Sequence, residues 1–253
     1  MRARLQSKHA MSISFSGIDG AGKSTQIESL CARIEELGLR VRVIQFWDDV
    51  AILTRLRESG ARTLFKGDSG VGTPSAPINR RDKNVQSWPM TLVRLSIYLA
   101  DAVSASILVR KARRSGVDVL IFDRYIYDEL ANLKLHAPFM RAYARLIASI
   151  VPMPDIAFIL DTVPAEARAR KPEYPLDFLK TCRQSYLVLS DLIGSMTVIP
   201  PMSKQEVTSE VLRIATKALP PGADPLNPSA MPSHICAIEK EKLNQSEVDP
   251  VAL

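Results

Sequence analysis

Three glycines, a lysine and a serine occur close together, at a spacing that suits phosphate chemistry. Gly17, Gly20 and Gly22 precede Lys23 and Ser24, giving the pattern Gly-x-x-x-x-Gly-Lys-Ser. Glycine lets a backbone turn tightly and approach a ligand without a Cβ in the way. The amide N–H groups of such a loop, together with the positive end of a following helix, converge on one point. That point suits a phosphate group.

The spacing is a full Walker A match, and it predicts a nucleoside triphosphate site. Lys23 would supply a mobile cation for the outer phosphates, and the Ser24 hydroxyl stands where it can ligate Mg²⁺. The alternative is a glycine turn between a strand and a helix that binds no ligand. We expect the whole loop to contribute to the nucleotide site, through Gly17, Gly20, Ala21, Gly22, Lys23, Ser24 and Thr25.

A second pair of chemically capable residues follows an apolar run at 117–122. Asp123 ends this run, where an acid can hold Mg²⁺ or its waters during phosphoryl transfer. The alternative role for Asp123 is a helix N-cap. Arg124 would aim a bidentate donor at the same cleft, unless it forms only a surface ion pair.

The role of Asp19 must differ from that of its neighbours, because a carboxylate inside an anion-binding loop repels phosphate. We therefore expect Asp19 to face a hydroxyl or a cation of a second substrate, although turns also tolerate Asp. Arg168 and Arg170 follow a later strand and could neutralise the charge that develops on a transferred group. Because they are two residues apart, they face different directions on a regular helix, and a solvated helix face is the alternative.

Alternating strand and helix patterns must position these residues. We expect strands at 12–16, 40–47, 117–122, 156–160 and 196–200, and helices at 26–37, 51–58, 90–114, 126–150 with a break near Pro138, 164–171, 176–194 and 204–218. Such alternation predicts an α/β fold, a five-stranded parallel sheet with helices on both faces. Ligands bind such sheets at the carboxyl ends of the strands, where all the polar residues above fall.

Composition limits the domain organisation and the partners. The chain has 253 residues, and we divide it into an extension at 1–11, one domain at 12–218 and a proline-rich tail at 219–253 that we expect to be disordered. The turn-rich segment 66–89 is either a mobile flap, whose Arg80 and Arg81 reach the ligand, or a solvated connector.

The net charge of +6 would suit either nucleic acid or a polyanionic nucleotide, and we favour the nucleotide because no arginine–aromatic recognition motif occurs. The three cysteines are widely spaced and form no C-x-x-C pair, which fits a reducing cytoplasm. The N-terminus lacks the apolar segment of a signal peptide. We expect no apolar run to approach the ~20 residues of a membrane helix, and we therefore predict no membrane partner.

These motifs resemble those of the thymidylate kinases. Gly17–Thr25 fits their loop Gly-x-Asp-Gly-x-Gly-Lys-Ser-Thr at every fixed place, including Asp19, which most Walker A loops lack. Asp123-Arg124-Tyr125 matches the Asp-Arg-Tyr at the end of their third strand. The segment Leu160–Glu166 is similar to the Leu-Asp-x-x-Pro-x-Glu that precedes their arginine-bearing lid, here expected at 165–176. The resemblance covers residues 12–218.

The resemblance implies a P-loop kinase that transfers the γ-phosphoryl group of ATP to dTMP, giving dTDP. Lys23 and the loop amides would hold ATP, and Ser24 and Asp123 would support Mg²⁺. Asp19 would meet the sugar of the acceptor, Arg124 its phosphate, and an arginine of the lid the transition state. Members of the family are usually homodimers, so the resemblance implies a homodimer as well.

The departures from the family concern the acceptor side. Phe46-Trp47-Asp48-Asp49 stands where the family often has Arg-Glu-Pro-Gly, and Ala102 follows Asp101 where the family has an arginine. Asp128, Glu129 and Asn132 occupy a zone in which the family tends to show serine and tyrosine. Two alternatives therefore stay open: a P-loop kinase with a different, unphosphorylated acceptor, and a nucleotide-binding regulatory module that does not turn over. A GTPase is disfavoured because no Asn-Lys-x-Asp motif occurs.

Overall fold

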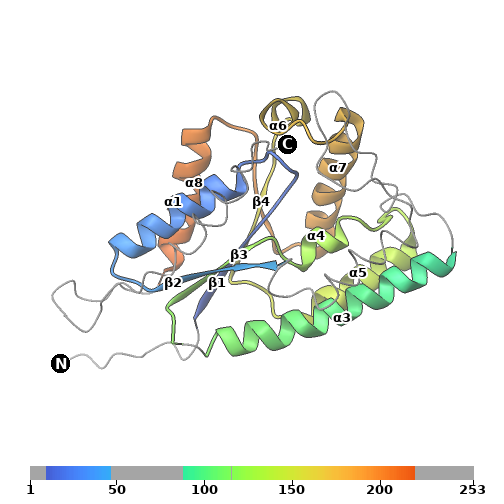
Figure 1. The fold of residues 1–253 in the computed structure, drawn as a ribbon, viewed down its shortest axis with the longest axis horizontal. Coiled ribbons are helices and arrows are strands. Elements are labelled where there is room, and N and C mark those ends of the chain that lie inside the picture. The colour runs from blue at the N-terminus through green and yellow to red at the C-terminus, as the bar shows by residue number, and fades with distance from the viewer. Residues whose placement is uncertain (1–9, 47–87, 115, 220–253) are drawn as a thin grey trace, which may run out of the picture.

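A five-stranded parallel sheet lies at the centre of the computed structural model, which describes residues 10–46, 88–114 and 116–219 (Figure 1). The strand order is β2-β3-β1-β4-β5, so the chain passes β3 on its way from β1 to β2 and passes β1 on its way from β3 to β4. The strands are β1 (Met11–Ser16), β2 (Val41–Gln45), β3 (Val119–Asp123), β4 (Ile156–Leu160) and β5 (Thr197–Ile199). The prediction of a five-stranded parallel α/β fold is confirmed.

The three central strands are almost entirely buried because helices cover both faces of the sheet. All of β4 is buried, as are the first four residues of β3, and neither strand alternates polar with apolar residues. β2 lies at an edge and alternates more, with an exposed Arg42. The register pairs Phe15 of β1 with Asp123 of β3 and with Phe158 of β4. The carboxyl ends of the central strands therefore lie side by side.

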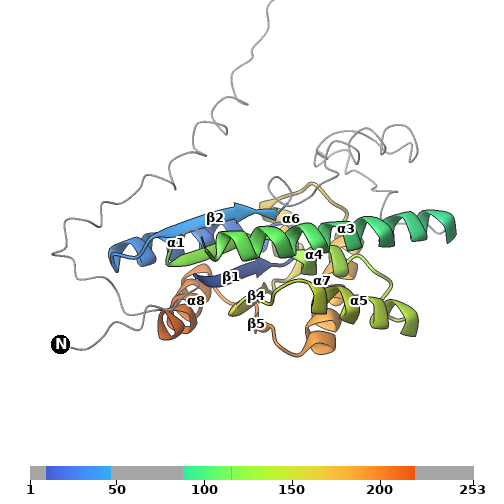
Figure 2. The ribbon, with the colours of Figure 1, turned by 90° about the horizontal axis from the view of Figure 1, so that it is seen from below.

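Two groups of helices cover the sheet. α1 and α8 pack together on one side of it, whereas α3 and α5 run next to each other on the other side (Figures 1 and 2). α4 and α7 complete the second group near the carboxyl ends of the strands. The helices are α1 (Lys23–Glu36), α3 (Trp88–Ala112), α4 (Ile126–Leu130), α5 (Pro138–Ile150), α6 (Pro164–Arg170), α7 (Leu176–Ile193) and α8 (Lys204–Ala218).

Local chemistry sets several of these boundaries. Pro138 and Pro164 each stand at the start of a helix, where the missing N–H of proline costs nothing. α8 begins after Ser203, whose side chain accepts a hydrogen bond from the Glu206 amide in a capping box, and it spans the predicted residues. α3 begins at Trp88, two residues inside the predicted loop 66–89. Ala10 is buried and Met11 opens β1, so part of the predicted extension belongs to the fold.

α3 contradicts one expectation from the sequence. Its segment Thr91–Ala112 has a mean hydropathy of 1.7 and is long and apolar enough to cross a membrane, although no such run was predicted. One stripe of the helix is buried in the core, comprising Leu95, Tyr98, Ala102, Ala105 and Val109. This packing explains the apolar composition as that of a core helix. Other apolar side chains remain exposed, namely Leu92, Val93, Leu99, Val103 and Ile107.

Some predictions fall on parts of the chain outside the described residues. These are the helix at 51–58, the acids that follow Trp47, most of the segment 66–89 with its two arginines, and nearly all of the tail at 219–253. Leu219 itself is half-buried and packs against the core, directly after α8.

Candidate active site

The loop between β1 and α1 needs its glycines for two different reasons. Gly17, Gly20 and Gly22 all have positive φ, at 145°, 83° and 90°, in a range that side chains with a Cβ rarely adopt. A Cβ on Gly17 would stand 2.6 Å from the carbonyl oxygen of Leu160, and a Cβ on Gly20 would clash with the carbonyl of Ala167. A Cβ on Gly22 would meet nothing within 4 Å. Gly22, at the start of α1, therefore leaves open the space that a phosphate would enter.

Lys23 is buried at the first turn of α1 and turns back over the loop. Its Nζ donates hydrogen bonds to the carbonyl oxygens of Gly17, at 2.8 Å, and Ile18, at 3.0 Å. Burial, with a smaller contribution from the nearby Arg124 guanidinium, lowers the pKa of Lys23 from 10.5 to about 8. Burial of the charged amine therefore costs free energy, and the negative charge of a bound phosphate would offset this cost.

Ser24 and Asp123 offer the oxygen donors that a hard cation requires. Ser24 is exposed on the first turn of α1, and Asp123 ends β3 beside the loop. No hydrogen bond or ion pair of either side chain occurs within the described ranges. Burial raises the pKa of Asp123, and the opposing effects of Lys23 and Arg124 do not cancel it. A hydroxyl and a desolvated carboxylate without protein partners fit Mg²⁺, which binds one or two protein oxygens together with substrate phosphates. The part of the chain that the structure describes holds no group of three or more metal-ligating acids, histidines or cysteines.

Arg124 lies between two carboxylates. Its Nη2 contacts Oδ1 of Asp19 in the loop, and its Nη1 lies 3.4 Å from Oδ1 of Asp128 in α4. Burial would lower the pKa of Arg124, but Asp128 and Asp19 outweigh it and raise that pKa. Burial likewise raises the pKa of Asp19, and Arg124 and Lys23 reverse this, so that the pKa falls below its ordinary value. Both residues are charged at neutral pH.

The backbone at Arg124 is unusual as well. Its φ is +68°, the only positive φ among the non-glycine residues that the structure describes. The Arg124 amide donates to the carbonyl oxygen of Phe15, at 3.0 Å, which extends the pairing of β3 with β1 by one residue. A left-handed residue directly after a buried strand is a form of strain that clusters at functional sites. It turns the chain sharply from β3 into α4.

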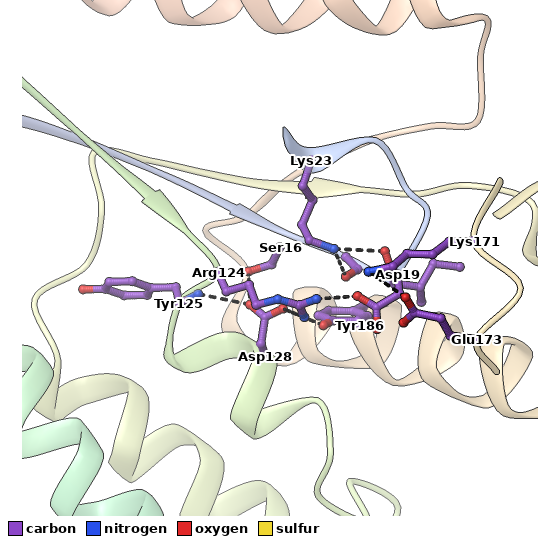
Figure 3. A network of polar contacts seen from close by, with 11 residues as sticks. Ser16, Asp19, Lys23, Arg124, Tyr125, Asp128, Lys171, Glu173 and Tyr186 are labelled. Carbon is purple, nitrogen blue, oxygen red and sulfur yellow. Dashed lines mark hydrogen bonds and ion pairs between the residues drawn. The ribbon is translucent and has the colours of Figure 1, made fainter. Parts of the chain in front are cut away.

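Asp128 joins four neighbours below the loop (Figure 3). Its Oδ2 accepts hydrogen bonds from the Ser16 hydroxyl, at 2.7 Å, and the Tyr125 amide, at 3.1 Å. Its Oδ1 accepts one from the Tyr186 hydroxyl, at 2.7 Å, and faces Arg124. Burial, and then the charge of Asp128, raise the pKa of Tyr186, which therefore stays a neutral donor. Asp128 is only 3% exposed, so these partners replace its contact with water.

Among the described residues, neither arginine of α6 forms a hydrogen bond or an ion pair with the loop. Arg170 donates from Nη2 to the Thr162 hydroxyl, at 2.8 Å, and from Nε to the carbonyl oxygen of Glu166, at 3.2 Å. Arg168 is half-exposed on the same short helix. Lys171, just beyond it, pairs with Glu173 at 3.2 Å and lies near Asp19 (Figure 3). The structure thus brings Asp19, Lys23, Asp123 and Arg124 together and leaves the α6 arginines at the margin.

Sequence reasoning missed two interactions at this edge of the sheet. Tyr186, on α7, could not be linked to Asp128 without a fold, although Asp128 stood out as an unusual residue. Asp161, which ends β4, accepts two hydrogen bonds from Arg183 of α7, from Nε at 2.6 Å and from Nη2 at 2.7 Å. The position of Asp161 at the end of an apolar strand was visible in the sequence, but its partner was not.

The fold and the glycine loop together define a P-loop kinase. No protein-family model matches the chain. It is similar to the probable thymidylate kinase of Archaeoglobus fulgidus, at 28% identity over 214 residues that cover 81% of this chain and 94% of the relative. It is also similar to the thymidylate kinase of Chlorobaculum parvum, at 33% identity over 172 residues, 64% of this chain and 65% of the relative.

The solved structures agree on the fold. The thymidylate kinase of Ehrlichia chaffeensis superposes with a TM-score of 0.51 at 21% identity, over 82% of this chain and 99% of that one. The thymidylate kinase of Candida albicans gives a TM-score of 0.54 at 17% identity, over 83% and 92%. The chain has the fold of these enzymes, and its curated relatives over most of its length are thymidylate kinases.

Proposed function

We propose that this protein is a thymidylate kinase, which transfers the γ-phosphoryl group of ATP to dTMP and releases ADP and dTDP. One observation carries the proposal beyond similarity. The loop carboxylate of Asp19 and the guanidinium of Arg124 meet at the mouth of the P-loop, beside Lys23. A site that binds only a nucleoside triphosphate needs no acid at that position. A second substrate with a hydroxyl and a phosphate needs both an acceptor and a cation at that point.

On the donor side, Lys23 and the loop amides would bind the phosphates of ATP. The two carbonyl oxygens that Lys23 now contacts hold its amine over the loop, so it needs only a short movement to reach a phosphate. Bound Mg²⁺ would supply charge neutralisation across the β- and γ-phosphates, with Ser24 and Asp123 as its protein contacts. Gly22 would let the phosphate approach the backbone at the start of α1.

On the acceptor side, Arg124 would bind the phosphate of dTMP and Asp19 its sugar hydroxyl. Both groups are about one quarter exposed, so a substrate can reach them. Arg168 and Arg170 would stabilise the charge of the transferring group once α6 reorganises around bound ATP. Phosphoryl transfer depends mainly on such positioning and charge stabilisation, because the protein forms no covalent bond.

A coupled ADP-release assay tests this function. The protein is supplied with ATP, Mg²⁺ and a panel of nucleosides and nucleoside monophosphates. We expect turnover with dTMP in preference to the other monophosphates. Turnover only with an unphosphorylated acceptor would replace the proposal with a different kinase. ATP binding without turnover on any acceptor would indicate a regulatory module.

We further propose that the protein acts as a cytoplasmic homodimer. On α3, the apolar residues Leu92, Leu99, Val103 and Ile107 recur at helical spacing and are 42% to 62% exposed. Such a stripe on one helix is a surface that a second copy of the chain can cover. A dimer would bury the stripe by pairing α3 with its counterpart across a two-fold axis. Light scattering of the purified protein measures the mass directly.

A further inference from the structure

Asp128 is a buried carboxylate near the loop with four polar neighbours, and it lies in the zone where the resemblance leads one to expect serine and tyrosine. Its two oxygens contact side chains from β1 and α7 and the backbone at the start of α4, as well as Arg124 (Figure 3). A buried carboxylate without such partners would be strongly unfavourable. The arrangement is therefore specific to an acid, and a serine hydroxyl could not fill it.

The two carboxylates beside Arg124 differ in one respect. The side chain of Asp19 is 24% exposed, whereas that of Asp128 is 2% exposed. Each one contacts a different terminal nitrogen of the guanidinium. A phosphate entering from solvent can therefore displace Asp19 from Nη2, but it cannot reach Asp128. The contact of Nη1 with Asp128 would then remain while Nη2 binds the phosphate.

The backbone conformation of Arg124 also has to be stabilised by its surroundings. A left-handed conformation at a non-glycine residue is strained unless the surroundings hold it. Asp128 Oδ2 accepts from the amide of Tyr125, the residue directly after Arg124, while Oδ1 faces the side chain of Arg124. One carboxylate thus restrains both the backbone and the guanidinium of Arg124.

We propose that Asp128, held in place by Tyr186, is a positioning residue that keeps Arg124 aimed at the acceptor phosphate. The inference rests on the proposed function, since it assigns Arg124 to that phosphate. Asp128 touches neither substrate itself. Its effect is to restrict the guanidinium before the acceptor arrives, so that less conformational entropy is lost on binding. Tyr186 acts one step further out, by fixing the rotamer of Asp128.

The test compares Asp128→Asn with a matched control, Asp118→Asn. Asn keeps the size of the side chain and can still accept from Ser16 and Tyr125, but it removes the charge that restrains Arg124. Asp118 also pairs with an arginine, Arg40, at the far end of the sheet. For Asp128→Asn we expect kcat/KM for dTMP to fall at least about tenfold, with the KM for ATP changed by less than about twofold. The control should match the wild type, and Tyr186→Phe should show the same pattern with a smaller loss.

A double-mutant cycle separates positioning from a general structural role. In an Arg124→Ala background, Asp128→Asn should cause little additional loss, because its effect acts through Arg124. Additive losses, or equal changes in the KM of both substrates, would overturn the proposal. If Asp128→Asn unfolds the protein, Tyr186→Phe takes its place in the cycle. It should then cause a loss of kcat/KM in the wild type and little additional loss in the Arg124→Ala background.

An NMR measurement keeps the inference separate from the proposed function. Guanidinium protons of Arg124 should be visible and slow to exchange in the wild type and in Tyr186→Phe, and lost in Asp128→Asn. The kinase proposal fails if the wild type shows no turnover with dTMP, whatever the NMR result. The positioning role fails if the Arg124 signals are unchanged in Asp128→Asn, even in an active enzyme.

Discussion

Replacing Lys23 by methionine should make the protein more stable while abolishing its activity. The side chain is 7% exposed and its pKa is lowered to about 8, chiefly by burial. Methionine has a similar shape and carries no charge, so Lys23→Met removes the cost of burying the amine. A residue that binds a charged ligand is expected to destabilise the ligand-free protein when its own charge is buried there.

The magnitude follows from the pKa shift. A fall from 10.5 to about 8 corresponds to about 3 kcal/mol against the folded state at neutral pH, since one pKa unit is about 1.4 kcal/mol. The substitution also removes the hydrogen bonds to Gly17 and Ile18, which offset about 1 to 2 kcal/mol of that gain. The expected net stabilisation is about 1 to 2 kcal/mol, or a rise in Tm of about 2 to 8 °C.

The pH dependence gives the stricter test. Between pH 8 and 10.5 the unfolded wild type binds more protons at this site than the folded protein does, so the wild type gains stability as pH rises. Methionine does not titrate, and the advantage of the variant should therefore shrink over that window. Urea denaturation at pH 7 and pH 9.5 measures both values. A variant less stable than the wild type at pH 7, with a difference that does not change with pH, would refute the reasoning.

Three further predictions concern other parts of the molecule. Gly20→Ala should destabilise the protein by about 2 kcal/mol or more, because the new Cβ would clash with the backbone of α6. Gly22→Ala should cost only about 1 kcal/mol, because its Cβ would have no atom within 4 Å. Equal losses of stability in urea denaturation would contradict this geometry. Mg²⁺-dependent turnover should fall on acidification at a higher pH than it would for an ordinary aspartate, because burial raises the pKa of Asp123 and protonation removes a Mg²⁺ ligand. Asp123→Asn should abolish this acidic limb of the pH–rate profile. An unchanged acidic limb in that variant would show that another group causes it. Ile107→Glu should convert a dimer to monomers in light scattering, while Leu146→Glu, at a comparably exposed residue of α5, should not; a dimer that survives the first change would place the interface elsewhere.

Most strands of the sheet could be predicted because the signal for a buried strand lies within a short stretch of sequence. Buried parallel strands read as continuous apolar runs, and this located Ile156–Leu160 without error and β3 to within two residues. Proline chemistry predicted the helix start at Pro164 and the break near Pro138, where α5 begins. The helix predicted at 204–218 has the bounds of α8. The error at the start of α3 has a simple cause. Pro89 is typical of a loop in the sequence, but it lies in the first turn of α3, where a helix tolerates proline.

The sequence could propose the residues of the candidate site, but it could not predict the contacts among them. The motif spacing identified Lys23 and Asp123, and the fold then brought them to one edge of the sheet. The pairing of Arg124 with two carboxylates depends on a left-handed backbone angle, which a sequence does not reveal for a residue other than glycine. The bond from Tyr186 to Asp128 links residues 58 positions apart. Such a contact follows only from the packing of α7 against α4.

The approach of Gly20 to Ala167 ties the nucleotide loop to α6 mechanically. Backbone meets backbone there, with no side chain between them to absorb a displacement. A displacement of the loop at Gly20 would therefore have to be accompanied by a displacement of α6. Arg168 and Arg170 follow Ala167 on that helix. We therefore expect the position of these two arginines to be coupled to the conformation of the loop.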